Sequence, residues 1–296
     1  MVAEIVDKPL LRRRLKRAHA RGDASAAFLL EHAVAEIAQR LGAVERRFPV
    51  AVAHGGQSDA LAGALIETGR VDEVYRLESV EPALAGARVP GAVCDEEALP
   101  LARASVDLFV STLALQWTND LPGALVQIRN ALRPDGLFLA ALTGGRTLTE
   151  LREAMFAAET EISGGASLRV MPAAETPELG ALLQRAGFAL PVADRDLLTV
   201  RYDNAFGLFR DLKAMGAASP LLERERRSPG RRFFLRTAEI YAERFRDPDG
   251  RIRASFEIVS LAGWAPHESQ QKPAPRGSGK VSLKAVLGRE SRSDRR

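Results

Sequence analysis

The stretch from Ser105 to Leu142 constrains the fold more than any other part of the chain. It holds two apolar runs, Val106 to Ser111 and Leu137 to Leu142. Neither run shows the regular polar alternation of a half-exposed strand, so each is typical of a strand covered on both faces. The two runs therefore predict buried strands of a parallel sheet that is flanked by helices.

The residues between these runs predict a helix. Asp120 can accept a backbone N–H as the N-cap, and Pro122 is tolerated in the first turn. Apolar side chains recur at helical spacing at Leu121, Leu125, Ile128 and Leu132. Pro134 to Gly136 then end the helix and turn the chain into the second apolar run. The whole stretch predicts one strand, helix, strand unit of an α/β fold.

Several motifs in and around this unit carry a resemblance to a known family. "LRPDGLF" entering a strand, "EALPLARASVDLFVSTLALQWTNDLPGAL" and the late "GWAPHESQQKP" together resemble class I S-adenosylmethionine (SAM)-dependent methyltransferases. They are similar in particular to the methyltransferase-like complex I assembly factors of the arginine-hydroxylase type, which are related to the malonyl-acyl carrier protein methyltransferase of biotin synthesis. The resemblance covers about Phe28 to Leu287.

The resemblance implies a Rossmann-like, seven-stranded, mostly parallel sheet with helices on both faces and a helical insertion before the last strand. It also implies SAM as cofactor and a complex I subunit as a possible partner. Within the chain we expect a loose basic arm at 1–24, a methyltransferase-like domain at 25–266 with a helical lid at about 204–246, and a polar tail at 267–296. The arm either contacts an acidic partner or is a solvated surface.

Length and composition exclude several classes of function. The chain has 296 residues, a net charge of +4 and 46% hydrophobic residues, which suits one large domain. Its acidic and basic residues are interspersed, so no nucleic-acid partner is expected. A single cysteine, Cys94, excludes an internal disulfide and fits a reducing cytoplasm. Without a long apolar run or a secretory signal, we expect a soluble cytoplasmic protein that does not insert into a membrane.

A glycine turn follows the first predicted strand, Phe48 to Ala53. Gly55 and Gly56 lie in this turn, where backbone can approach a ligand and the next helix presents free N–H groups. The family pattern here is acidic-x-Gly-x-Gly-x-Gly, whereas this chain has Ala53 at the acidic position and Asp59 near the last glycine position. Gly55 and Gly56 are predicted either to bind SAM or only to make the strand-to-helix turn.

Three carboxylates follow the next two predicted strands. Glu78 comes after the run from Glu73 to Leu77, where a carboxylate can accept hydrogen bonds from both hydroxyls of a ribose. The resemblance implies that Asp95 binds the exocyclic amine of adenine, with Glu96 beside it. The alternatives are that Glu78 is a surface carboxylate and that Asp95 only caps a turn.

Gln116 and Trp117 follow the fourth predicted strand, facing the crevice in which open α/β sheets bind ligands. We expect them to contact the substrate. Family members often have His-Trp at this place, so with Gln116 this chain lacks a histidine that could act as general base there. Gln116 can still orient an amide or a guanidinium. Trp117 either stacks on a planar or cationic group or seals the core. No catalytic residue is predicted, because methyl transfer relies chiefly on the placement of donor and acceptor.

Three functions remain open. The first is SAM-dependent methyl transfer to a protein substrate during complex I assembly. The second is arginine hydroxylation of a complex I subunit; no histidine here begins a His-x-Asp/Glu motif, so no iron site or other metal site is predicted and the oxidant must come from a cofactor or a second protein. The third is a non-catalytic assembly chaperone with a degenerate SAM site. The acceptor and the oligomeric state are not predicted.

Overall fold

The computed structural model describes residues 4–23, 26–165, 167–225 and 229–271. The chain divides into two units, residues 1–266 and residues 267–296. The helices, strands and predicted site residues belong to the first unit. Of the polar tail expected at 267–296, residues 272–296 lie outside the described residues.

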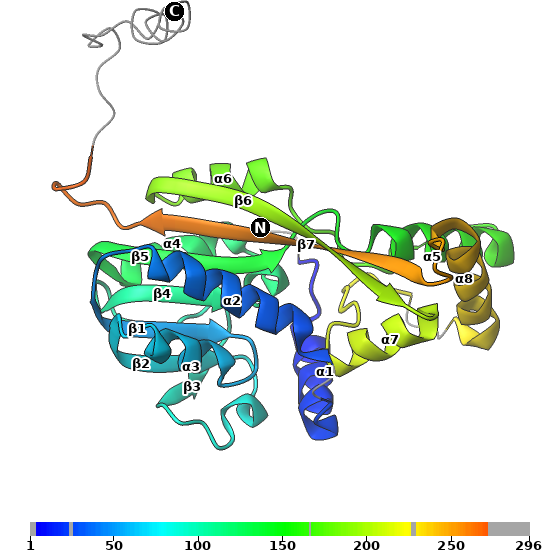
Figure 1. Cartoon of the computed structure of the whole chain (residues 1–296), viewed down its shortest axis with the longest axis horizontal. Helices are drawn as coiled ribbons and strands as arrows, with labels where there is room; N and C mark the ends of the chain where they lie inside the picture. The colour runs from blue at the N-terminus through cyan, green and yellow to red at the C-terminus, as the bar shows by residue number, and fades with distance from the viewer. Residues whose placement is uncertain (1–3, 24–25, 166, 226–228, 272–296) are drawn as a thin grey trace, which may run out of the picture. The chain divides into compact units, whose positions relative to one another are not determined.

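A seven-stranded sheet with the order β3-β2-β1-β4-β5-β7-β6 forms the centre of the first unit (Figure 1). Its strands are β1 (Phe48–Gly55), β2 (Val71–Glu78), β3 (Gly91–Val93), β4 (Val106–Thr112), β5 (Leu132–Thr143), β6 (Ala189–Tyr202) and β7 (Ile252–Trp264). Neighbouring strands from β3 to β5 pair in parallel, whereas β7 is antiparallel to both β5 and β6. The expected Rossmann-like, mostly parallel sheet is confirmed.

The central unit is β4, helix α4 (Leu121–Ala131) and β5, as the apolar runs predict. The strand begins earlier than predicted, because Leu132 and the expected turn from Pro134 to Gly136 already belong to β5. Asp120 caps α4 by accepting a hydrogen bond from the backbone N–H of Gly123 at 2.8 Å. Alternate β4 side chains enter opposite cores: Phe109 packs on one face of the sheet, and Leu108 and Val110 pack on the other. Burial on both faces explains why this strand lacks polar alternation.

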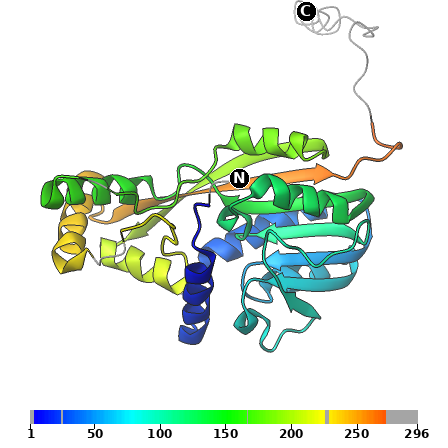
Figure 2. The ribbon, with the colours of Figure 1, turned by 180° about the vertical axis from the view of Figure 1, so that it is seen from behind.

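Helices cover both faces of the sheet. Helices α2 (Phe28–Gly42) and α3 (Ala60–Glu67) pack on one face, which is toward the viewer in Figure 1. Helices α4 and α6 (Thr176–Arg185) pack on the other face, which Figure 2 shows from behind. The carboxyl ends of the parallel strands form the edge at which open α/β sheets bind ligands.

The expected helical insertion lies between β6 and β7. It consists of α7 (Ala205–Ala214) and α8 (Gly230–Phe245), and α8 packs against α5 (Thr149–Ser163). These helices share a third apolar core with the first residues of β7, including Ile252 and Phe256. The paired strands β6 and β7 lead from the main sheet to these helices (Figure 1).

The expectation of a loose N-terminal arm is wrong for the described residues. Lys8–Arg21 forms helix α1, and Asp7 caps it by accepting a hydrogen bond from the N–H of Leu10 at 2.9 Å. Its buried side chains are Leu10, Leu11, Leu15 and Ala18. Leu11 and Leu15 pack with side chains from beyond β2. A narrow apolar stripe among arginines is enough to pack this helix against the domain, because a distant part of the chain supplies the surface that covers the stripe.

No helix in the described part of the chain is long and apolar enough to cross a membrane.

Candidate functional site

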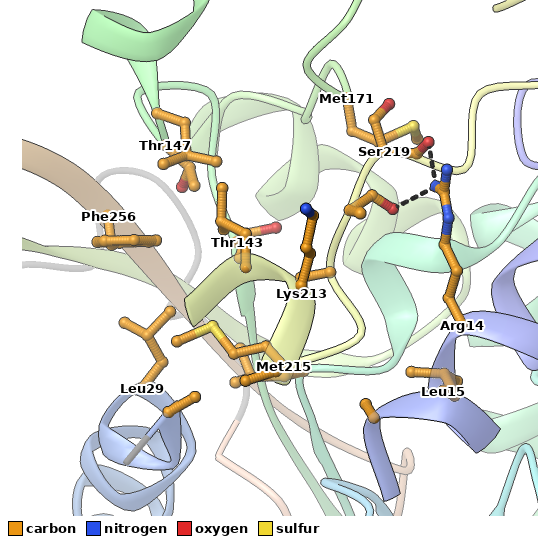
Figure 3. A pocket seen from close by; sticks show the side chains of 18 of the residues that line it. Arg14, Leu15, Leu29, Thr143, Thr147, Met171, Lys213, Met215, Ser219 and Phe256 are labelled. Atoms are coloured by element: carbon orange, nitrogen blue, oxygen red, sulfur yellow. Dashed lines mark hydrogen bonds between the residues drawn. The ribbon is translucent and has the colours of Figure 1, made fainter. Parts of the chain in front are cut away.

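A cavity of about 710 Å³ lies at the carboxyl ends of β1, β4 and β5. Its floor includes Gly56 after β1, Gln116 and Trp117 in the short 3₁₀ helix η3 (Leu115–Trp117) after β4, and Thr143 at the end of β5. Its other walls come from α1, α2, α5, α7, α8 and β7 and the loops beside them. Figure 3 shows Leu15 of α1, Leu29 of α2 and Phe256 of β7 around the cavity. Apolar side chains dominate these walls, among them Leu29, Leu151, Met155, Phe209, Phe234 and Phe256.

The glycine turn is required by packing. Gly55 has φ +75°, and a Cβ placed on it would lie 2.5 Å from the Cβ of Ala114 and 2.9 Å from the carbonyl oxygen of Thr112. Gly56 has φ +83° and lines the cavity, whereas Gly55 does not. The turn therefore has a structural reason at Gly55 and an open face toward a ligand at Gly56.

Glu78 lies at the end of β2, as expected, but it is bound by the protein itself. Its side chain is 1% exposed and forms an ion pair with Arg76 at 2.7 Å. Its other oxygen accepts a hydrogen bond from the N–H of Gln57 at 3.3 Å. Arg76 also pairs with Asp59 at 2.5 Å. Burial raises the pKa of Glu78 to about 7, against the opposing effect of Arg76.

Asp95 and Glu96 follow β3 and hold helix α1. The ammonium of Lys8 lies 3.1 Å from Asp95, 2.8 Å from Glu96 and 3.2 Å from Glu97. The guanidinium of Arg12 lies 2.6 Å from Asp95. Burial alone would lower the pKa of Lys8, but the carboxylates, Glu96 first, outweigh burial and raise it. Lys8 is thus a charged group held at the centre of an acidic cluster.

Gln116 and Trp117 line the cavity, and their contact with a substrate stays a prediction. The side-chain amide of Gln116 donates to the carbonyl of Leu113 at 2.8 Å, and its Oε1 is buried with no hydrogen-bond partner among the described residues. Trp117 lines the cavity and also packs against an apolar cluster that includes Leu11 and Leu15 of α1. Both functions weighed for Trp117, contact with a ligand and sealing of the core, are therefore compatible with its position.

The predicted residues thus meet only in part. Gly56, Gln116 and Trp117 lie around one cavity, and Gly55 lies beneath the turn. The three carboxylates Glu78, Asp95 and Glu96 do not line this cavity. They occupy the positions predicted from the sequence, at the ends of β2 and β3, but each is paired with a cation of the same chain. Their proposed contacts with a nucleoside remain a prediction.

Sequence reasoning missed the cations Lys8, Arg12 and Arg76. A signal existed for Arg76, because residues two apart on a strand share a face and Arg76 therefore lies beside Glu78. Lys8 and Arg12 are four apart and share a helix face. Their partners are more than eighty residues away in the chain, so only the fold identifies them.

The described residues contain no group of three or more His, Cys, Asp or Glu side chains placed to hold a metal ion. His54 is fully buried beside the site, with its Nδ1 2.9 Å from the hydroxyl of Ser111. Burial lowers the pKa of His54 to about 4, so it is neutral at physiological pH. It is a structural residue of β1.

Comparisons with known proteins agree with this architecture. A family model described as a methyltransferase domain matches residues 51–140. The chain is 39% identical over 267 residues to the mitochondrial arginine-hydroxylase NDUFAF5 of Mus musculus, a match that covers 86% of this chain and 76% of that protein. It is 34% identical over 280 residues to the malonyl-[acyl-carrier protein] O-methyltransferase of a Methylovorus strain, covering 89% of this chain and 91% of that protein. The chain belongs to the methyltransferase family that contains these relatives.

A solved structure of this fold supports the topology alone. The YcgJ protein of Bacillus subtilis superimposes with a TM-score of 0.54 and 15% identity, covering 80% of this chain and 99% of that chain. Glu78, Asp95 and Glu96, which the sequence predicts to bind the nucleoside of SAM, are paired with cations of the same chain. Gly56 lines the cavity, so the backbone of the glycine turn is the part of the predicted SAM site that a ligand in the cavity can reach. In this arrangement Glu78, Asp95 and Glu96 do not fit the nucleoside of SAM.

Proposed function

We propose that this protein acts in the assembly of respiratory complex I as a SAM-dependent methyltransferase that modifies a side chain of a complex I subunit. Family membership supports the proposal, since one relative is named an arginine-hydroxylase and another an O-methyltransferase. We propose a cytoplasmic location, which cell fractionation tests.

The observation that carries the proposal is the cavity itself. It joins the glycine turn, where family members are expected to bind SAM, to apolar walls that include the helical insertion. Gln116 Oε1 lacks a partner among the described residues and can accept an N–H from an amide or a guanidinium. Trp117 can stack on a planar or cationic group. This pair suits a protein side chain that carries N–H groups on a planar head.

The contribution of this chain to such a reaction is placement. A pocket that holds the acceptor beside the bound donor lowers the entropic cost of reaction and needs no dedicated base. That expectation agrees with the presence of Gln116 at a position where a histidine would be the usual base.

The test is intact-mass analysis of complex I subunits from cells that lack this protein and from the same cells after the gene is restored. We expect one subunit to be lighter in the deletion by the mass of one CH2 group, because methylation replaces a hydrogen by a methyl group. Loss of the mass of one oxygen atom would instead establish hydroxylation, which the name of the mouse relative suggests.

A second candidate is a non-catalytic assembly chaperone. One observation favours it: Asp59 and Glu78 pair with Arg76, and Asp95 and Glu96 pair with Lys8, so the predicted SAM contacts are taken up inside the protein. In that case every subunit keeps its mass in the deletion, while assembly of the complex still fails.

A further inference from the structure

The acidic cluster Asp95, Glu96 and Glu97 holds the N-terminal helix in place. Lys8 has a side chain that is 13% exposed and reaches all three carboxylates. Glu96 is 2% exposed and also accepts a hydrogen bond from the hydroxyl of Ser79. Because Lys8 is in contact with three acids and largely out of water, its withdrawal would leave the buried carboxylate of Glu96 without a counter-charge.

The chain on both sides of Lys8 is fixed as well. The N–H groups of Ile5 and Val6 each donate to the side-chain oxygen of Asn119 at 2.7 Å. Val6 forms a β-bridge with Leu221. The guanidinium of Arg14 donates to the carbonyl of Ala218 at 2.7 Å. Residues 5–14 thus connect the ends of β3 and β4 to the loop after α7, and they cross the edge of the sheet where the cavity opens.

Helix α1 and a nucleoside would compete for the same carboxylate groups. Ribose hydroxyls and the adenine amine donate hydrogen bonds to carboxylates, and so do the ammonium of Lys8 and the guanidinium of Arg12. Asp95 has both oxygens engaged, one by Lys8 and the other by Arg12. Glu96 has one oxygen on Lys8 and the other on Ser79. A carboxylate oxygen can accept more than one hydrogen bond, but Glu96 is only 2% exposed with Lys8 against it, so a ligand reaches Glu96 only after Lys8 moves away.

We propose that helix α1 is a built-in competitor of the nucleoside: Lys8 and Arg12 occupy Asp95 and Glu96, two of the three carboxylates predicted to bind it, and a nucleoside ligand reaches these two only when α1 releases them. This inference rests on the proposed function for the identity of the ligand, SAM or its product S-adenosylhomocysteine. Because Leu15, Ala18 and His19 of α1 also line the cavity, its release opens the acceptor end at the same time. Ligand exchange and acceptor access are therefore coupled through one helix.

The test compares Lys8→Met with Lys16→Met. Lys16 lies on the same helix and also pairs with an acid, Glu81, but its side chain is 49% exposed and that of Glu81 is 69% exposed. Each full-length protein is titrated with S-adenosylhomocysteine by calorimetry, and hydrogen exchange is followed at the amides of residues 8–21. We expect Lys8→Met to speed exchange in α1 and to bind the ligand about tenfold more tightly than wild type, within the usual range of coupling between sites. Lys16→Met should match wild type in both.

Wild-type protein provides a measurement without any substitution. If ligand and helix compete, saturating S-adenosylhomocysteine speeds hydrogen exchange in α1, since coupling is reciprocal. Slower exchange on ligand addition, or weaker binding by Lys8→Met, would mean that α1 covers the ligand and would overturn the competition. Equal binding by all three proteins would also overturn it and leave the nucleoside site intact. No binding by any of them would contradict the nucleoside site itself, and the competition with it.

Discussion

Replacement of Gly55 by alanine tests why the turn after β1 contains glycine. A residue with φ +75° costs an L-amino acid roughly 1–2 kcal/mol. The added Cβ would lie 2.5 Å from Ala114 Cβ and 2.9 Å from the Thr112 carbonyl oxygen, and such overpacking costs a further 1–3 kcal/mol or so. We expect Gly55→Ala to lower the free energy of unfolding by roughly 2–5 kcal/mol.

Gly69→Ala is the matched control. Gly69 has φ +64°, but a Cβ placed there meets nothing within 4 Å, so only the backbone cost of about 1 kcal/mol remains. Urea unfolding followed by circular dichroism measures both variants without ligand. The reasoning fails if Gly55→Ala destabilises the protein no more than Gly69→Ala, because the turn would then have space for a side chain.

Two further predictions concern buried charge. The pKa of His54 in the folded protein is about 4, below its ordinary value of 6.5. The neutral histidine therefore stabilises the fold above pH 6.5, and this contribution is lost as the pH falls toward 4, by about 3 kcal/mol relative to His54→Asn. Urea unfolding of both proteins measures this, and a difference in unfolding free energy that stays constant with pH would contradict it. Arg76→Met leaves the buried Glu78 without its ion-pair partner and should lower the free energy of unfolding by about 3–5 kcal/mol. The control Arg88→Met changes a side chain that is 81% exposed and should lower it by less than about 0.5 kcal/mol. Thermal unfolding compares the two variants, and equal losses of stability would show that Arg76 is not a structural charge.

The sequence predicted those parts of the fold that local pattern determines. The apolar runs on either side of α4 identify β4 and β5, since a strand buried on both faces needs apolar residues at every position, and Asp120 marks the start of the helix between them. The turn after β1 was also predictable, because Gly55 and Gly56 follow an apolar run.

Helix α1 and its attachment could not be predicted in this way. Its four buried side chains lie among seven arginines and lysines in Lys8–Arg21, so its composition predicts a solvent-exposed segment. The surface that buries Leu11 and Leu15 comes from residues around Val80 and Ala83. The functional consequence, that Lys8 takes up the carboxylates expected to bind a nucleoside, depends on this long-range contact and not on any local motif.

The central claim is that the protein acts through the cavity at the carboxyl edge of the sheet. Two adjacent residues on α5 have different surroundings and make a matched pair of variants: Met155 lines the cavity, whereas Phe156 is 61% exposed. Cells that lack the protein are supplied with Met155→Trp or Phe156→Trp, and assembled complex I is measured in their membranes, with the melting temperature of each purified variant as a check on folding. The account predicts that Phe156→Trp restores assembly and that Met155→Trp, folded but with an indole in the cavity, does not. Full restoration by Met155→Trp would contradict it.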